Sequence, residues 1–350
     1  MKKIIILAFT TIVIALSACK KGKETEPTPE ITKQPIVYAA GYEANDVTRT
    51  AMFWKDGKAT ALEPTKYNDV RGGIAVSGND VYIGATENLV AGKTSMPKYF
   101  KNGVAVNLGD GTKFEQITGI AVAGNDVHVI GSEFSSTTFK YIAKYWKNGV
   151  ATKLTADNIT SEAYAIAISG NDVYIVGHIN NMAAYWKNGS PITLPNTPTF
   201  AGNGRGIAIN GTDVYIAGYA RNERIAGYGT AYWKNESLNT IESTATPSSS
   251  GQARAIAING NDIHIIDNLY NPTTGINIPR YWKNGVVTNL SDGRLTATVT
   301  GLSVVNNDVY IGGYQSDANG TFVATTWKNG VATKIGTGSK STLIMSMVVK

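Results

Sequence analysis

Ala165-Ile-Ala-Ile-Ser-Gly-Asn-Asp-Val-Tyr-Ile-Val-Gly177 and Ala184-Tyr-Trp-Lys-Asn-Gly189 are the two parts of a unit that this chain repeats along most of its length. In the first part, small residues alternate with β-branched residues, which is the period-two pattern of a β-strand. The Asn188-Gly189 step favours a type I′ hairpin, because both residues tolerate a positive φ. Each unit therefore predicts four short antiparallel strands joined by tight turns.

An aromatic residue followed by lysine marks each unit. The seven marks lie 40 to 49 residues apart and are Trp54, Phe100, Trp146, Trp186, Trp233, Trp282 and Trp327. All six tryptophans of the chain occupy this one position. A period of roughly 40–50 residues with about four strands is typical of the blades of a β-propeller.

The two ends of the repeat region indicate how the ring closes. Residues 36–41 form a second strand with no first strand before it, and residues 343–349 form a first strand with no second strand after it. We expect the last strand to complete the first blade, which leaves no exposed sheet edge at the seam. The prediction is an all-β, seven-bladed β-propeller over residues 36–350, closed by the C-terminal strand.

The repeated pattern of residues 165–177 and 184–189, closed by a leucine, is similar to the HAF family of extracellular repeats. The resemblance covers nearly all of residues 36–350 and implies a propeller. The His-Ala-Phe step of that family is replaced here by Ala-Tyr-Trp or Lys-Tyr-Trp. The resemblance implies no activity.

The N-terminus predicts an exported, lipid-anchored protein. Residues 1–18 combine Lys2 and Lys3 with an apolar run over 4–16 that is too short to span a bilayer, as in a signal peptide. Leu16-Ser-Ala-Cys19 resembles the bacterial lipobox, and this resemblance implies cleavage before Cys19 and its acylation with palmitate-like chains, which would anchor the chain stably to a membrane. The alternative is an ordinary signal peptide with a chance cysteine, although Cys19 is the only cysteine in the chain.

Residues 19–35 are polar and charged, and we expect them to form a flexible tether between the acylated Cys19 and the propeller. Position 20 is lysine, which by resemblance to Gram-negative sorting rules implies transport to the outer membrane. The charged run after Cys19 also favours the cell surface as a destination. The predicted localisation is therefore extracytoplasmic and lipid-anchored, at the outer membrane.

The net charge of +6 falls to +4 once Lys2 and Lys3 leave with the signal peptide. The basic excess includes the lysine that follows each aromatic mark, and such a lysine ring could bind nucleic acid. We interpret these lysines instead as solvated turn residues, because no basic run or stacking motif accompanies them. No nucleic-acid partner is predicted.

The sequence offers little for catalysis. His128 and His264 replace a repeated tyrosine and are expected to pack between strands, so His178 is the only histidine placed for function. One histidine favours neither a metal site nor a Ser-His-Asp triad, and no catalytic residue, metal or cofactor is predicted. A pair of acids for glycoside hydrolysis could come from the loops, which carry Glu43, Asp46, Glu87, Glu133 and Asp317.

The connections after the second and fourth strands vary between units, and they are expected to share one face of the propeller, the variable-loop face. Variable loops on a rigid scaffold commonly carry binding sites. The residues expected just before each first strand are Gly72, Thr118, Tyr164, Arg205, Arg254, Thr300 and Leu343. The residues expected to end each second strand are Tyr42, Thr86, Ser132, His178, Tyr219, Asn268 and Tyr314.

From these two sets we predict a ligand site at the centre of the variable-loop face. The arginines suit a carboxylate or phosphate, and the tyrosines suit sugars or extended peptides. The predicted contacts are Arg205, Arg254, Tyr164, His178, Tyr42, Tyr219 and Tyr314. The leading interpretation is a binding or assembly module for a glycan, peptide or protein; the alternatives are a carbohydrate-active hydrolase or lyase and a structural spacer.

Overall fold

A computed structural model describes residues 34–44, 49–64, 66, 68–90, 93–195, 202–222, 227–241, 250–336 and 338–350. The predicted signal peptide, Cys19, nearly all of the tether and Asp46 lie outside these residues. Residues 35–350 form one compact unit. Its described residues contain 29 strands and no helix.

The strands form seven separate antiparallel sheets, one per blade. Blade 1 contains β29 (Ser341–Val349), β1 (Val37–Ala44), β2 (Arg49–Lys55) and β3 (Lys58–Leu62). Blade 2 contains β4 (Asn68–Asp69), β5 (Ile74–Ser77), β6 (Asp80–Val90), β7 (Thr94–Lys101) and β8 (Val104–Asn107). Blade 3 contains β9 (Phe114–Ala123), β10 (Asp126–Ser135), β11 (Lys140–Lys147) and β12 (Val150–Lys153). Blade 4 contains β13 (Ser161–Ser169), β14 (Asp172–Ile179), β15 (Met182–Lys187) and β16 (Ser190–Thr193).

The remaining blades follow the same order. Blade 5 contains β17 (Gly202–Asn210), β18 (Asp213–Asn222), β19 (Gly227–Lys234) and β20 (Ser237–Thr240). Blade 6 contains β21 (Ser250–Asn259), β22 (Asp262–Asn271), β23 (Ile276–Lys283) and β24 (Val286–Asn289). Blade 7 contains β25 (Ala297–Val305), β26 (Asp308–Ser316), β27 (Phe322–Lys328) and β28 (Val331–Lys334).

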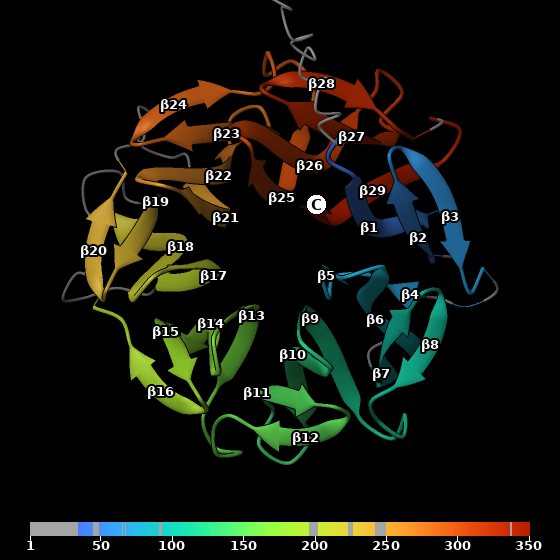
Figure 1. Ribbon diagram of the computed structural model, residues 1–350, viewed down its shortest axis with the longest axis vertical. Coiled ribbons are helices and arrows are strands. Elements are labelled where there is room, and N and C mark those ends of the chain that lie inside the picture. The colour runs from blue at the N-terminus through green and yellow to red at the C-terminus, as the bar shows by residue number, and fades with distance from the viewer. Residues whose placement is uncertain are drawn as a thin grey trace, which may run out of the picture. The chain divides into compact units, whose positions relative to one another are not determined.

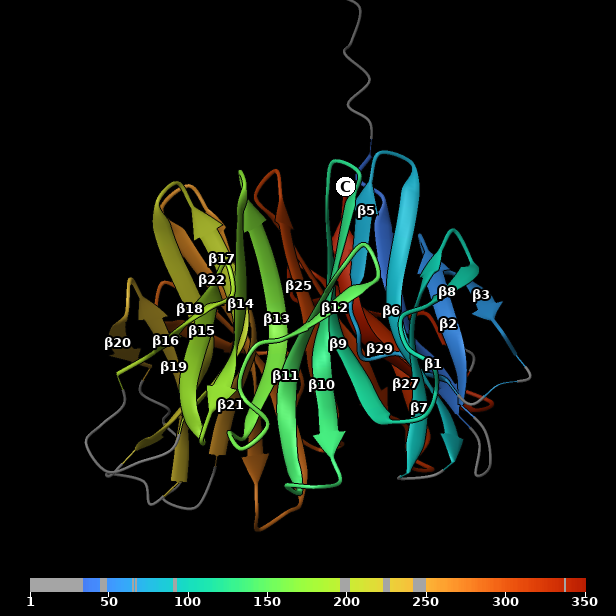
Figure 2. The same ribbon diagram turned by 90° about the horizontal axis from the view of Figure 1, so that it is seen from below.

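The seven blades surround a central axis (Figure 1). The first strand of each blade lies innermost and the fourth lies outermost, and the edge-on view shows the strands running between the two faces of the ring (Figure 2). This arrangement confirms the predicted seven-bladed β-propeller.

The ring closes as predicted, because β29 pairs with β1 along the whole of both strands, from Val37 opposite Val349 to Ala44 opposite Ser341. Ile344 and Met347 of β29 are buried, at 0% and 6% exposure. Met345, which we would place in the core with them, instead lines the central channel. The reason is a β-bulge at this residue, described below.

The turns of the opposite, constant face follow one template. In blade 3, Asn148 and Gly149 have φ angles of 50° and 85°, the left-handed pair that a type I′ turn requires. Asn148 accepts a hydrogen bond from the backbone N–H of Val127 through Oδ1 (2.8 Å) and donates one to Asp126 through Nδ2 (2.8 Å). Lys147 forms an ion pair with the same aspartate at 2.8 Å.

The same Lys–Asp pair recurs in blades 2, 4, 5, 6 and 7, with N–O distances of 2.7 to 3.1 Å. The lysines of these six blades are about half exposed, as expected of solvated turn residues, and each is neutralised by a repeated aspartate.

Four of the six repeated tryptophans donate a hydrogen bond to the preceding blade, whereas the indole N–H of Trp282 is buried without a partner among the described residues. Trp146 of blade 3 is fully buried, and its indole N–H donates to the carbonyl oxygen of Leu108 at the end of blade 2 (3.1 Å). Trp186, Trp233 and Trp327 make the matching bond to the preceding blade. One residue thus supplies both a large apolar contact and a directional link between blades, which explains its recurrence.

A β-bulge interrupts the innermost strand of six blades. In blade 4, Ala163 pairs with Gly177 and Ala165 pairs with Val176, so Tyr164 has no partner in the ladder. The sequence predicted that this strand begins near Ala165, but β13 begins at Ser161. The alternation of side chains is broken at the bulge, so the upstream half of the strand carries no continuous sequence pattern.

Glycine opposite the bulge permits a close approach of the two strands. A β-carbon on Gly177 would lie 1.8 Å from the carbonyl oxygen of Glu162. The equivalent glycines 41, 131, 218 and 313 have the same contact at 1.8 to 2.0 Å. Blades 2 and 6 carry Ala85 and Asp267 at the matching ladder position.

Candidate functional site

One residue of each innermost strand projects toward the axis where the bulge occurs. These residues line both halves of the central channel and are Arg71, Thr118, Tyr164, Arg205, Arg254, Thr300 and Met345. Of the seven residues expected just before a first strand, five line the channel, although they lie within their strands, and Gly72 and Leu343 do not hold the equivalent position. In blade 2 the innermost strand is divided into β4 and β5, and Arg71 occupies the gap; in blade 1 the bulge places Met345 two residues beyond Leu343.

The channel opens on the variable-loop face into a cavity of about 420 Å³. Most of its wall consists of polar side chains. Besides the seven channel residues, the lining contains Asp69, Thr86, Asn88, Gln116, Ile117, Glu162, Thr298 and Tyr314. Toward the constant face the channel continues into a second cavity of about 330 Å³. The volume of the first cavity falls within the range of small-ligand sites.

Arg205 and Arg254 come from neighbouring blades, and neither forms an ion pair with a carboxylate that the structure describes. The Nε atoms of both are buried and have no hydrogen-bond partner among the described residues. Burial lowers the pKa of Arg254, and the positive charge of Arg205 lowers it further. Two partly buried like charges without a described carboxylate partner would suit an anion with two oxygen atoms.

Tyr164 connects this pair to a polar cluster. The guanidinium carbon of Arg205 lies 3.8 Å from the centroid of the Tyr164 ring, and the tyrosine hydroxyl donates to Glu162 at 2.8 Å. His178 lies behind this contact: its Nδ1 is 3.4 Å from the Tyr164 hydroxyl and 3.3 Å from the amide nitrogen of Asn203. Burial raises the pKa of Tyr164 and lowers the pKa of His178, so both are neutral near pH 7.

The remaining predicted contacts divide between the wall and its support. Tyr314 lines the cavity with Arg205, Arg254 and Tyr164. Tyr219 lies behind Arg205, whose guanidinium carbon is 5.9 Å from its ring centroid. Tyr42 is buried, at 8% exposure, and the guanidinium carbon of Arg49 lies 4.9 Å from its ring centroid. Neither Tyr42, Tyr219 nor His178 is part of the cavity wall.

Several residues of the cavity wall were not among the contacts predicted from the sequence. Asp69, Gln116, Glu162 and Thr298 each lie two positions before a channel residue and line the same cavity. The innermost strand continues upstream of the bulge, and residues two positions apart on a strand face the same way. This spacing of two is the signal that could have identified them. Asp69 is bound by Arg71 at 3.0 Å and by Arg49 at 3.5 Å.

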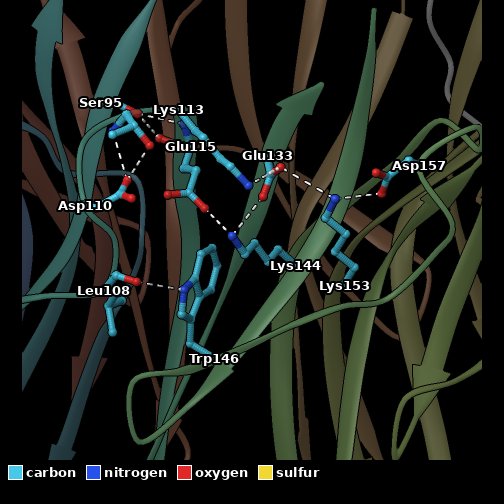
Figure 3. Close-up of polar contacts among 11 residues, drawn as sticks. Ser95, Leu108, Asp110, Lys113, Glu115, Glu133, Lys144, Trp146, Lys153 and Asp157 are labelled. Carbon is cyan, nitrogen blue, oxygen red and sulfur yellow. Dashed lines mark hydrogen bonds and ion pairs between the residues drawn. The ribbon is translucent and has the colours of Figure 1, made fainter. Parts of the chain in front are cut away.

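Buried ion pairs on the variable-loop side account for two of the predicted loop acids. Lys144 lies between Glu115 and Glu133, at 2.9 Å from the latter, and Lys113 lies 3.0 Å from Glu133 (Figure 3). In blade 2 the fully buried Lys98 is placed likewise, 2.5 Å from Glu87 and 2.8 Å from Glu63.

In blade 6 Arg280 pairs with Asp267, and both side chains are buried. Of the other predicted loop acids, Glu43 pairs with Lys340 at 2.7 Å, and Asp317 accepts backbone hydrogen bonds within its own turn.

The electrostatics of these acids differ from those of a glycosidase. Burial would raise the pKa of Glu133, but the hydrogen bonds from Lys144 and Lys113 outweigh it and hold that pKa below its usual value. Wherever the pKa of a described carboxyl group departs from its usual value, it is lowered. A catalytic acid in glycoside hydrolysis needs a raised pKa, so these groups do not supply one.

The two other histidines occupy blade interiors. Nδ1 of His128 lies 2.6 Å from the Tyr145 hydroxyl, and Nδ1 of His264 lies 2.6 Å from that of Tyr281. Burial and then the neighbouring lysine lower the pKa of each. Within the described part of the chain, no group of three or more potential ligands is arranged to hold a metal ion, and no helix is long and apolar enough to cross a membrane.

Comparison with known proteins identifies the fold. No family model and no curated protein matches the chain. Among solved structures, it resembles the β-propeller domain of the trilobed protease from Pyrococcus furiosus, with a TM-score of 0.55, 11% identity, and coverage of 89% of this chain and 95% of that one. The fold is a seven-bladed β-propeller.

The Pyrococcus horikoshii acylaminoacyl peptidase is also similar, with a TM-score of 0.50 and 11% identity over 87% of this chain and 51% of the peptidase. A further acylaminoacyl peptidase, in complex with a chloromethyl ketone, has a TM-score of 0.51 and 12% identity over 87% and 52% of the two chains. The chain thus spans about half the length of these peptidases. At such identities the likeness concerns the fold alone.

Proposed function

We propose that this protein is a lipid-anchored β-propeller of the bacterial cell envelope that binds an extracytoplasmic glycan, peptide or protein through an anionic group. The observation that carries the proposal is the pair Arg205 and Arg254, whose buried Nε atoms have no hydrogen-bond partner among the described residues. A partly buried cation whose buried N–H donor has no partner is unfavourable for the folded protein. An anionic ligand would supply the absent counterion.

The predicted loop acids support binding rather than hydrolysis. Three of the five, Glu43, Glu87 and Glu133, are held by lysines. The rigid seven-bladed scaffold and its polar cavity suit a binding or assembly module.

A glycan array and a pull-down from envelope extract, both with residues 20–350, test this function. The array and the pull-down should yield a ligand whose binding falls by well over tenfold when Arg205→Ala and Arg254→Ala are combined. The matched control combines Lys147→Ala and Lys187→Ala on the constant face, where each lysine pairs with a turn aspartate, and it should bind like the wild type. If the double lysine variant lost binding and the double arginine variant kept it, the ligand site would lie on the constant face and not on the variable-loop face.

The anchor is tested separately, since Cys19 lies outside the described residues. Metabolic labelling with a fatty-acid analogue should mark the wild-type protein and leave Cys19→Ala unlabelled. Equal labelling of the two proteins would show that the lipobox resemblance at Leu16-Ser-Ala-Cys19 is fortuitous.

A further inference from the structure

We infer that the cavity recognises a monocarboxylate rich in hydroxyl groups, a sugar acid of the uronic type, in preference to a phosphate. This inference rests on the proposed function, since it takes the arginine pair as the place where the ligand's charge binds. It deepens that proposal by naming the ligand's charge and the groups around it.

The charge of the cavity favours an anion. Its wall carries three arginines, Arg71, Arg205 and Arg254, and two carboxylates, Asp69 and Glu162. Asp69 is already bound by Arg71 at 3.0 Å and, from outside the wall, by Arg49 at 3.5 Å. A carboxylate on the other two arginines brings one negative charge to the site, whereas a phosphate dianion would bring a second negative charge near Glu162 in a partly desolvated space.

The wall also offers hydrogen bonds suited to hydroxyl groups. The side chains of Asn88, Gln116 and Thr298 line the cavity and make no hydrogen bond to any residue that the structure describes. The hydroxyls of Thr118 and Thr300 donate to backbone carbonyls of the next blade at 2.6 and 2.8 Å. Their oxygen lone pairs remain free to accept, so the ring of polar groups can both donate and accept, as sugar hydroxyls do.

A sugar ring fits this wall better than the carboxyl end of a peptide. The apolar side chains of the lining are Ile117 and Met345, on different blades, and the lining also contains the rings of Tyr314 and Tyr164, the latter in contact with Arg205. A peptide terminus would present an apolar or amide-bearing side chain that finds no apolar pocket here. A pyranose presents hydroxyls around its edge and one apolar face, which a tyrosine ring can cover.

Isothermal titration calorimetry of residues 20–350 at pH 7.5 tests the assignment with matched probes. D-glucuronate, D-galacturonate and D-mannuronate carry the carboxylate and the hydroxyls. D-glucuronamide removes the charge, glucose 6-phosphate replaces the carboxylate by a phosphate, and cyclohexanecarboxylate keeps the charge and the ring without hydroxyls. N-acetyl-alanyl-alanine represents a peptide end.

At least one uronate should bind, and each of the other probes should bind at least tenfold more weakly. Arg254→Met should weaken uronate binding by at least tenfold, and Lys147→Ala should leave it unchanged. Thr298→Val should weaken the uronate more than it weakens cyclohexanecarboxylate. Tighter binding of the phosphate or the dipeptide, equal binding of the uronate and cyclohexanecarboxylate, or no uronate binding would each overturn the inference.

The failure of this inference can be told apart from failure of the proposed function. If no uronate binds but an array or pull-down ligand still depends on Arg205 and Arg254, the proposed function stands and the sugar acid is wrong. If the captured ligands bind equally well without the two arginines, both the proposed function and the sugar-acid inference are wrong.

Discussion

The guanidinium carbon of Arg205 lies 3.8 Å from the centroid of the Tyr164 ring, and the two residues are the bulge residues of neighbouring blades. The tyrosine is held in turn by its hydrogen bond to Glu162 at 2.8 Å. Arg205 is therefore positioned by an aromatic face rather than by a carboxylate. A cation positioned in this way keeps its hydrogen-bond donors available to a ligand.

Removal of that aromatic face should weaken ligand binding. Tyr164→Ala should reduce affinity by up to about thirtyfold, because Arg205 loses the surface that fixes it; a cation–π contact is worth roughly 0.5–2 kcal/mol. Tyr164→Phe keeps the ring and should stay within about threefold of the wild type. Calorimetric titration of both variants makes the comparison, and an equal loss in the two would assign the effect to the hydroxyl.

Deletion of residues 341–350 should destabilise the propeller severely. The deletion removes β29, the strand that pairs with β1, and with it Ile344, Met347 and Val349, at 0%, 6% and 5% exposure. Losses of this kind cost roughly 2–5 kcal/mol for each large buried side chain, so thermal denaturation should show a much lower midpoint or no cooperative transition. Met345→Ala is the control, since this side chain lines the channel and its truncation should change the midpoint little.

The repeat allowed the fold to be predicted because every blade must solve the same packing problem. Asn148-Gly149 specifies its turn locally, and Trp146 specifies a contact with the preceding blade, so both are visible in sequence. Arg205 and Arg254 were visible as departures from the repeat. These features depend on local backbone preference or on comparison between units.

Other features depend on geometry that no local pattern encodes. A bulge adds one unpaired residue to a strand. In blade 1 this residue is Met345, which faces the channel, whereas Leu343 was predicted to do so. The pairing of Lys144 with Glu115, 29 residues away, follows from the packing of strands rather than from spacing. Glu162 was missed because its strand was taken to begin after it.

The ion cluster of Lys144 with Glu115 and Glu133 should make stability depend on pH. Because the pKa of Glu133 is lowered from about 4.5 by folding, its contribution is present above that value and lost as the pH falls through the lower folded pKa. Folding raises the pKa of Lys144, so its contribution persists to high pH and is lost only above about 10.5.

Glu133→Gln tests this dependence through thermal denaturation between pH 7 and pH 3. The variant should be clearly less stable than the wild type at pH 7, and the difference should shrink as the pH falls below the ordinary glutamate pKa of about 4.5 and through the lower pKa of folded Glu133. Glu43→Gln, which removes a surface pair with Lys340, should change stability little throughout. A difference that stays constant over the range would show that Glu133 acts by packing alone.

Arg254 and Arg280 lie in the same blade, on β21 and β23, and should respond in opposite directions to the same substitution. Arg280 is buried with its counterion Asp267, so Arg280→Met leaves a buried carboxylate unpaired and should cost roughly 3–5 kcal/mol of stability. Arg254 has no described counterion, and its pKa is lowered by burial and by Arg205. Arg254→Met should therefore raise the free energy of unfolding of the ligand-free protein by about 0.5–2 kcal/mol, the gain typical of relieving strain at a functional site. Urea denaturation measures both, and a loss of stability in Arg254→Met comparable to that in Arg280→Met would mean that Arg254 is a structural residue rather than a cation awaiting a ligand.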